Sequence, residues 1–146
     1  MKKTYHKSGG FLISKIKQIQ GRVFEKLLDE NGISEFNGAQ GRILFVLWNK
    51  DNIPISTLSE ETGLAKTTLT NMLDRLERNG HIVREYDPKD RRSVKIRLTE
   101  NTKDMRDKYD QVSEKMNRIF YNDFSEKEIL FFESCLEKIL KNLTTN

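Results

Sequence analysis

Hydrophobic residues recur at helical spacing at both ends of this chain. In the first long segment, which Asn31-Gly32 ends, one helix face carries Leu12, Ile16, Ile19, Val23 and Leu27. Near the other end, a second apolar face consists of Met105, Tyr109, Val112, Met116 and Ile119. Ser125 and Glu128 then form an S-x-x-E capping box, which predicts a last helix bearing Phe132, Leu136, Ile139 and Leu143.

The middle of the chain shows a different pattern, with shorter helices separated by glycines. Residues 38–49 are apolar on most sides, which predicts a buried helix. After the breaker Asn52-Ile53-Pro54, a short helix is expected with Ser56 as its N-cap and Gly63 just past its end. The helix that follows has Gly80 as its stop, and its apolar side carries Leu69, Met72, Leu73 and Leu76. Two short helices joined by a tight glycine-containing turn match a helix-turn-helix.

Two strand-rich segments, HIVREY and SVKIRL, come directly after this pair of helices. In the second segment Val94, Ile96 and Leu98 alternate with polar residues, which predicts a strand with one face on the core. The six residues DPKDRR are expected to form the loop of the hairpin. A helix-turn-helix followed by a hairpin is a winged helix, so the expected fold is mainly α with a small β-hairpin wing.

The domain organisation follows from these elements. A chain of 146 residues fits a single domain, 1–146, with its own core. Within it, residues 37–100 are expected to form the winged helix-turn-helix, and residues 8–32 and 101–146 a helical dimerisation region. Amphipathic helices so far apart in sequence can cover one another only in part, so a dimer interface is expected from Leu12, Ile16, Phe132, Leu136, Ile139 and Leu143. A monomeric helical bundle beside the winged helix is the alternative.

The net charge of +4 is concentrated in one quarter of the chain. Residues 66–99 hold nine Lys or Arg and five Asp or Glu, so the whole excess lies there. This asymmetry indicates a surface that binds a polyanion. On the polar side of the second short helix, Thr and Asn suit thymine methyls and adenine edges, and Lys and Arg suit phosphates or guanine. The residues expected to contact DNA there are Lys66, Thr67, Thr70, Asn71 and Arg75.

Two adjacent arginines, Arg91 and Arg92, are expected at the tip of the hairpin. Their mutual repulsion is costly unless an anion approaches, and the negative potential of a narrow minor groove attracts arginine. Asp87 and Asp90 are close enough in sequence to brace the guanidinium groups. The alternative is that DPKDRR is only a solvated turn.

The motif LDRLERNGHIVRE (73–85), followed by DPKDRRSVKIRLTE (87–100), resembles the multiple antibiotic resistance regulator (MarR) family. By that resemblance Arg92 is the wing-tip arginine, Asp90 is its acidic partner, and the recognition helix contains Lys66, Thr67, Thr68, Thr70, Asn71 and Arg75. The resemblance implies a homodimeric repressor that binds a pseudo-palindromic DNA operator and is released by a small aromatic or lipophilic effector. The sequence departs from the family at Ala65, where a capping Ser is common, and at Asn101-Thr102, where Lys-Gly is frequent.

A pocket for such an effector could be lined by aromatic residues, although aromatic residues on apolar faces more often belong to the hydrophobic core. The candidates are Phe11, Trp48, Tyr109, Phe120 and Phe132. A different class of function also stays open, a winged helix that docks on other proteins without binding DNA. Salt-dependent affinity for duplex DNA would separate the two.

Several other classes of protein are not expected. His6 and His81 have no second ligand at metal spacing, and no nucleophile, base and orienting group converge, so we expect no enzyme, no metal site and no cofactor. His81 is expected to be structural or solvated. The single Cys135 should be shielded by Phe131, Phe132, Leu136 and Ile139. Because Lys15 and Lys17 interrupt the N-terminal segment and no apolar run could span a membrane, a cytoplasmic protein is expected.

Overall fold

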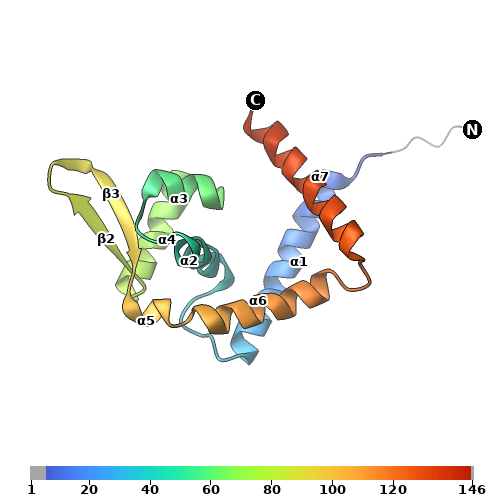
Figure 1. Cartoon of the computed structure of the whole chain (residues 1–146), viewed down its shortest axis with the longest axis horizontal. Helices are drawn as coiled ribbons and strands as arrows, with labels where there is room; N and C mark the ends of the chain where they lie inside the picture. The colour runs from blue at the N-terminus through green and yellow to red at the C-terminus, as the bar shows by residue number, and fades with distance from the viewer. Residues whose placement is uncertain (1–5, 146) are drawn as a thin grey trace, which may run out of the picture.

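The computed structural model describes residues 6–145, except for the side chain of Arg91. It contains a three-stranded antiparallel sheet and several helices, with the wing at one end and the first helix and the elbow before the last helix toward the other (Figure 1). The elements in chain order are α1 (Gly9–Glu30), α2 (Gly38–Asn49), β1 (Ile53–Pro54), α3 (Ile55–Thr62), α4 (Lys66–Arg78), β2 (Ile82–Asp87), β3 (Asp90–Leu98), α5 (Glu100–Lys103), α6 (Arg106–Phe120) and α7 (Glu126–Thr144). The fold class expected from the sequence is confirmed.

Capping residues explain where several helices begin and end. The predicted box at the start of α7 is confirmed, because the Ser125 hydroxyl accepts from the backbone N–H of Glu128 and the Glu128 carboxylate accepts from the N–H of Ser125. Asn37 and Gln40 form a second capping box at the start of α2, whose bounds match the predicted 38–49. Gly63 ends α3 with a φ of 72°, a left-handed conformation that costs glycine little.

The start of α3 differs from the sequence prediction. Pro54, rather than Ser56, occupies the N-cap position, and Ser56 lies inside the first turn. The predicted breaker is also a short edge strand, because Ile53 pairs with Ile96 and Pro54 with Lys95. Proline is tolerated at both places, since it has no N–H to donate to a ladder or to the first turn of a helix.

The loop of the wing is shorter than the sequence suggested. Asp87 pairs with Asp90, so only Pro88 and Lys89 form the turn, and Arg91 and Arg92 belong to β3. The register shifts beside this pair, because Tyr86 is opposite Val94 while Asp87 is opposite Asp90. The six-residue loop was therefore a wrong prediction, since the acidic residues at each end of DPKDRR continue the ladder.

The core lies where α2, α3 and α4 pack on the sheet. Its fully buried side chains come from all these elements and from α1 and α6: Leu28, Ile43, Leu44, Leu47, Leu58, Leu69, Leu73, Leu76, Ile82, Ile96, Leu98 and Val112. The inward face predicted for the second strand is confirmed at Ile96 and Leu98, whereas Val94 is half-buried. This core fixes α4 and the wing on one rigid unit.

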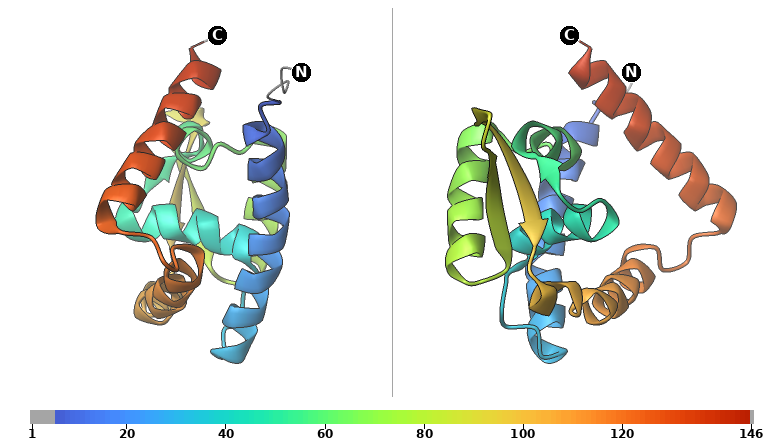
Figure 2. Two further views of the ribbon diagram at one scale, coloured as in Figure 1. Left: turned by 90° about the vertical axis from the view of Figure 1, so that its right-hand side faces the viewer. Right: turned by 60° about the vertical axis from the view of Figure 1, so that its left-hand side comes forward.

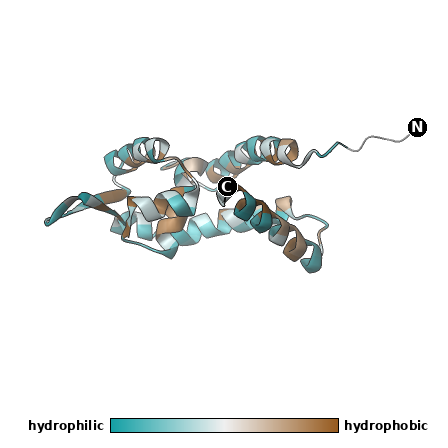
Figure 3. Ribbon diagram, turned by 90° about the horizontal axis from the view of Figure 1, so that it is seen from above, coloured by the Kyte–Doolittle hydropathy of each residue, from teal (hydrophilic) through white to brown (hydrophobic). Residues whose placement is uncertain are grey.

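The first and last helices contribute little to this core. α6 leads away from the winged helix to an elbow, and α7 then stands apart from the remaining elements in the second view of Figure 2. α7 has no buried residue, and in α1 only Leu28 is buried. Seen from above, hydrophobic positions occur along both helices (Figure 3).

Candidate nucleic-acid interface

The polar side of α4 is open to solvent along its whole length. Leu69, Leu73 and Leu76 anchor the opposite side in the core. All of the residues predicted for the recognition helix are exposed, namely Lys66, Thr67, Thr68, Thr70, Asn71 and Arg75. Ala65 is the N-cap residue and makes no side-chain cap, in keeping with its departure from the family pattern. The first turn of α4 therefore keeps N–H groups that no N-cap side chain occupies.

The two aspartates of the wing bind the backbone of the turn. The Asp87 carboxylate accepts from the backbone N–H of Lys89 (2.9 Å), and that of Asp90 accepts from the backbone N–H of Arg92 (3.0 Å). Aspartate commonly shapes turns in this way, by binding the backbone two residues further on. The two carboxylates thus brace the main chain of the turn, and the Arg92 side chain is exposed. The side chain of Arg91 lies outside the described part of the structure.

Lys89 is a residue of the wing that the sequence interpretation left out. It stands in the two-residue turn itself, next to Pro88, and is exposed. Because the hairpin turns at Pro88 and Lys89, Lys89 lies at the tip of the wing. The sequence already placed Lys89 in the expected hairpin loop DPKDRR, but the interpretation gave weight only to the two arginines.

Arg84, on β2, is a second residue that the sequence interpretation missed. Its guanidinium lies 2.8 Å from an Asp74 carboxylate oxygen and 3.2 Å from one of Glu77, both on α4. It also donates to the backbone carbonyl of Thr70 (3.2 Å). The side chain is only 12% exposed. α4 and the wing are therefore joined directly by one side chain.

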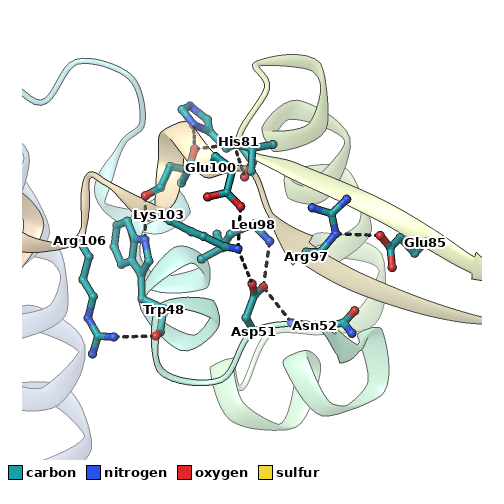
Figure 4. Close-up of polar contacts among 12 residues, drawn as sticks. Trp48, Asp51, Asn52, His81, Glu85, Arg97, Leu98, Glu100, Lys103 and Arg106 are labelled. Atoms are coloured by element: carbon teal, nitrogen blue, oxygen red, sulfur yellow. Dashed lines mark hydrogen bonds and ion pairs between the residues drawn. The ribbon is translucent and has the colours of Figure 1, made fainter.

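A polar junction joins the winged helix to α6 (Figure 4). The indole N–H of Trp48 donates to the Thr102 carbonyl (2.9 Å), and Arg106 donates to the Trp48 carbonyl (2.8 Å). The His81 ring is buried, with Nδ1 2.9 Å from the Thr102 hydroxyl and Nε2 3.0 Å from the Glu35 carbonyl. Since a carbonyl only accepts, Nε2 carries the proton in this arrangement. The structural role predicted for His81 is confirmed.

With this geometry in place, the sequence matches can be interpreted. A model of the MarR family matches residues 36–94, which run from the start of α2 into β3. YfiV of Bacillus subtilis, an HTH-type transcriptional regulator, is 39% identical over 64 residues, covering 44% of this chain and 40% of that protein. The organic hydroperoxide resistance transcriptional regulator of the same species is 33% identical over 91 residues, covering 62% of this chain and 60% of that protein. The winged-helix region of the chain thus matches the MarR family.

Solved structures of the MarR family resemble this chain over almost its whole length. A mutant MarR from E. coli complexed with operator DNA is 25% identical, with a TM-score of 0.78 over 90% of this chain and 92% of that one. A MarR transcriptional regulator from Methanosarcina mazei Go1 shares the fold at 24% identity, with a TM-score of 0.79 over 93% and 96% of the two chains. By contrast, the sequence alignments span less than half the length of the first three curated relatives, at 40%, 45% and 47%.

An open cavity of about 740 Å³ lies between α1, α2, α4 and α6. Phe24, Phe45 and Tyr109 supply its aromatic wall, and Thr68 of α4 also lines it. Burial raises the pKa of Tyr109 to about 12. Of the five aromatic residues proposed from the sequence, Tyr109 alone lines this cavity. Thr68, assigned to the recognition helix, is shared between the cavity wall and the exposed surface.

The predicted dimer residues occupy exposed or half-exposed positions in the single chain. Leu12 and Ile16 line an apolar groove of about 360 Å³ with Ile119 and Phe120. On α7, Phe132 packs at the elbow against Phe120, with 6.4 Å between ring centroids. Leu136 is half-buried, while Ile139 and Leu143 are exposed.

The environment predicted for Cys135 is wrong for the single chain, in which this thiol is exposed. The reason is that α7 has no buried residue, so its apolar side chains do not surround the thiol as a core would. Across residues 6–145, no helix is long and apolar enough to cross a membrane.

Proposed function

We propose that this chain is a homodimeric, DNA-binding transcriptional repressor with a pseudo-palindromic operator. One observation supports the proposal most strongly: the exposed Thr and Asn side chains of α4 lie beside a wing that carries exposed cations. In this proposal residues 37–100 bind DNA, and residues 8–32 and 101–146 form the dimer. The operator-bound MarR of E. coli, at 25% identity, supports the same use of the fold.

The two DNA-reading elements have different chemistry. In α4, Asn71 and the threonines offer short polar groups for base edges in the major groove, and Lys66 and Arg75 offer charge to phosphates or guanine. In the wing, Arg92 and Lys89 are exposed cations suited to the minor groove and the backbone. Asp87 and Asp90 hold the main chain of the turn, so these cations start from an ordered position.

The proposed partner of the terminal helices is a second copy of the chain. Leu12 and Ile16 on α1 are 51% and 44% exposed, and Leu140 and Leu143 on α7 are 61% and 71% exposed. Such a large apolar surface is unusual on a soluble monomer and is typical of an interface. Two-fold symmetry of the protein then matches two half-sites about 10 base pairs apart.

Release by a small aromatic or lipophilic effector is part of the same proposal. The 740 Å³ cavity is large enough for such a molecule, and its wall combines aromatic rings with Arg42. Because Thr68 and Met72 of α4 belong to that wall, a bound molecule would touch the recognition helix itself.

The experiment compares two variants on operator and scrambled duplex at several salt concentrations, after footprinting upstream of the gene has identified the operator. Asn71→Ala should cost about 1–3 kcal/mol on the operator and little on scrambled DNA, because it removes a base contact. Arg92→Ala should weaken both duplexes alike and lower the salt slope by about one unit per lost phosphate contact.

Lys26→Ala, which removes an exposed cation of α1, is the matched control and should bind like the wild type. If the wild type has no affinity for any duplex, the docking module without DNA binding is the better assignment. If Arg92→Ala alone binds like the wild type, the wing is a solvated turn.

A further inference from the structure

The acidic residues of α4 raise a question for a helix proposed to approach DNA. Asp74 and Glu77 lie on the same helix as Asn71 and Arg75, and their side chains are 50% and 42% exposed. Carboxylates so close to phosphates would repel them. Their charge must be compensated by a neighbouring cation for α4 to bind a polyanion well.

Arg84 is that cation, and its contacts follow one line along α4. Thr70, Asp74 and Glu77 are spaced by four and three residues, so they share one helix face, which is the face toward β2. Arg84 contacts all three, through the Thr70 carbonyl and the two carboxylates. Glu77 is held twice, because its other oxygen accepts from the backbone N–H of Arg84 (3.1 Å).

We propose that Arg84 is a positioning residue for sequence-specific DNA recognition, which sets the angle of α4 against the wing. This inference rests on the proposed DNA binding. Arg84 itself is 12% exposed and would touch no base. Its fork of donors fixes α4 at three points along two helical turns, so that the base-reading face and the wing meet the duplex as one rigid surface.

This role differs from that of a mere surface ion pair. An exposed ion pair contributes little to stability. A nearly buried arginine whose donors lie near acceptors holds those acceptors in a defined geometry. Without Arg84, α4 would still fold, because Leu69, Leu73 and Leu76 remain in the core. Its orientation relative to the wing would be less defined, and base-specific contacts depend on that orientation more than phosphate contacts do.

The test measures the ratio of affinities for operator and scrambled duplex in three variants. Arg84→Met removes the guanidinium but keeps the length of the side chain, and should lower the ratio by about tenfold, the size of one lost base-pair contact. A triple variant that combines Arg84→Met with Asp74→Asn and Glu77→Gln also lacks the uncompensated carboxylates. It should regain affinity for both duplexes, but its ratio of affinities should stay low. Arg84→Lys, which keeps the charge without the fork, should be intermediate.

Arg97→Met is the matched control. Arg97 is also a strand arginine with a carboxylate partner, at 2.8 Å, but that partner is Glu85 within the same hairpin. Its loss should leave the operator ratio unchanged. Amide hydrogen exchange in the absence of DNA adds a readout that does not depend on DNA binding, and Arg84→Met should speed exchange in α4 more than Arg97→Met does.

The outcomes are distinct. An unchanged ratio in Arg84→Met, with the wild type binding the operator, would overturn the positioning role. So would a triple variant that restores the ratio fully, because Arg84 would then act only by neutralising charge. If the wild type binds no duplex, the proposed function fails instead, while the hydrogen exchange still reports whether Arg84 fixes α4.

Discussion

Replacing two leucines on the last turns of α7 should dissociate the proposed dimer. The perturbation is Leu140→Ala together with Leu143→Ala. These side chains are 61% and 71% exposed in the single chain, so neither contributes much to the fold of one subunit. Alanine keeps the helix propensity of α7, and the change therefore acts on the interface rather than on the helix.

The size of the effect follows from the exposed fractions. Fully burying a leucine side chain is worth about 1.5–3 kcal/mol, so the part still exposed can contribute roughly 1–2 kcal/mol for each leucine. A two-fold dimer contains both leucines twice, which gives about 4–8 kcal/mol if all four become buried. Because every 1.4 kcal/mol is a factor of ten, the dissociation constant of the dimer should rise by about a thousandfold or more.

Sedimentation equilibrium at several protein concentrations measures this constant directly, and circular dichroism checks that the variant stays helical. Glu137→Ala with Lys138→Ala changes two exposed polar residues of the same helix and should leave dimerisation nearly unaltered. A leucine variant that dimerises within about threefold of the wild type would refute the assignment of α7 to the interface.

Three further changes test the fold around the cavity and the elbow. Gly41→Ala places a Cβ 2.7 Å from a ring carbon of Tyr109, so urea denaturation should show a loss of about 1–3 kcal/mol; a gain would refute the packing. Burial raises the pKa of Tyr109 from 10.0 to about 12, so the folded state keeps the phenol neutral where the unfolded chain ionises. Its contribution to stability should be complete below pH 10 and lost between pH 10 and 12, and Tyr109→Phe should remove that slope from the pH dependence of unfolding. Ser125→Ala should cost about 1 kcal/mol in thermal unfolding through the lost cap of α7, whereas an unchanged melting temperature would show that this end of the helix frays.

The parts of the fold that local chemistry determines could be predicted from the sequence. The apolar positions of residues 38–49 predicted α2 at its observed bounds. Ser125 with Glu128 predicted the start of α7. The alternation in the second strand identified Ile96 and Leu98 as core. In each case the signal lies within a few residues of the feature that it predicts.

The errors arose where distant residues decide the local structure. Ile53 and Pro54 form a strand only because Ile96 and Lys95 pair with them, more than forty residues later. The pairing of Asp87 with Asp90 depends on the register of the whole hairpin, which composition does not reveal.

The candidate site shows the same division. The exposed side of α4 was predictable, because the apolar residues that anchor it define the opposite side. The contacts of Arg84 were not, since a surface arginine and a nearly buried one look alike in sequence. Likewise, nothing near Thr68 indicated that α1 and α6 would close a cavity against it.

The length of α6, which connects the winged helix to α7, affects the distance between the two wings of the proposed dimer. At 1.5 Å per residue, its fifteen residues span roughly 22 Å between the Trp48–Arg106 junction and the elbow before α7. A tilt of about 5° at one end therefore displaces the other end by on the order of 2 Å. If the two arms of the proposed dimer tilted together, the separation of the two wings would change by about twice that amount. In the proposed dimer, a small rotation at the Trp48 junction would therefore change the spacing of the two α4 helices by about one base-pair step, roughly 3.4 Å.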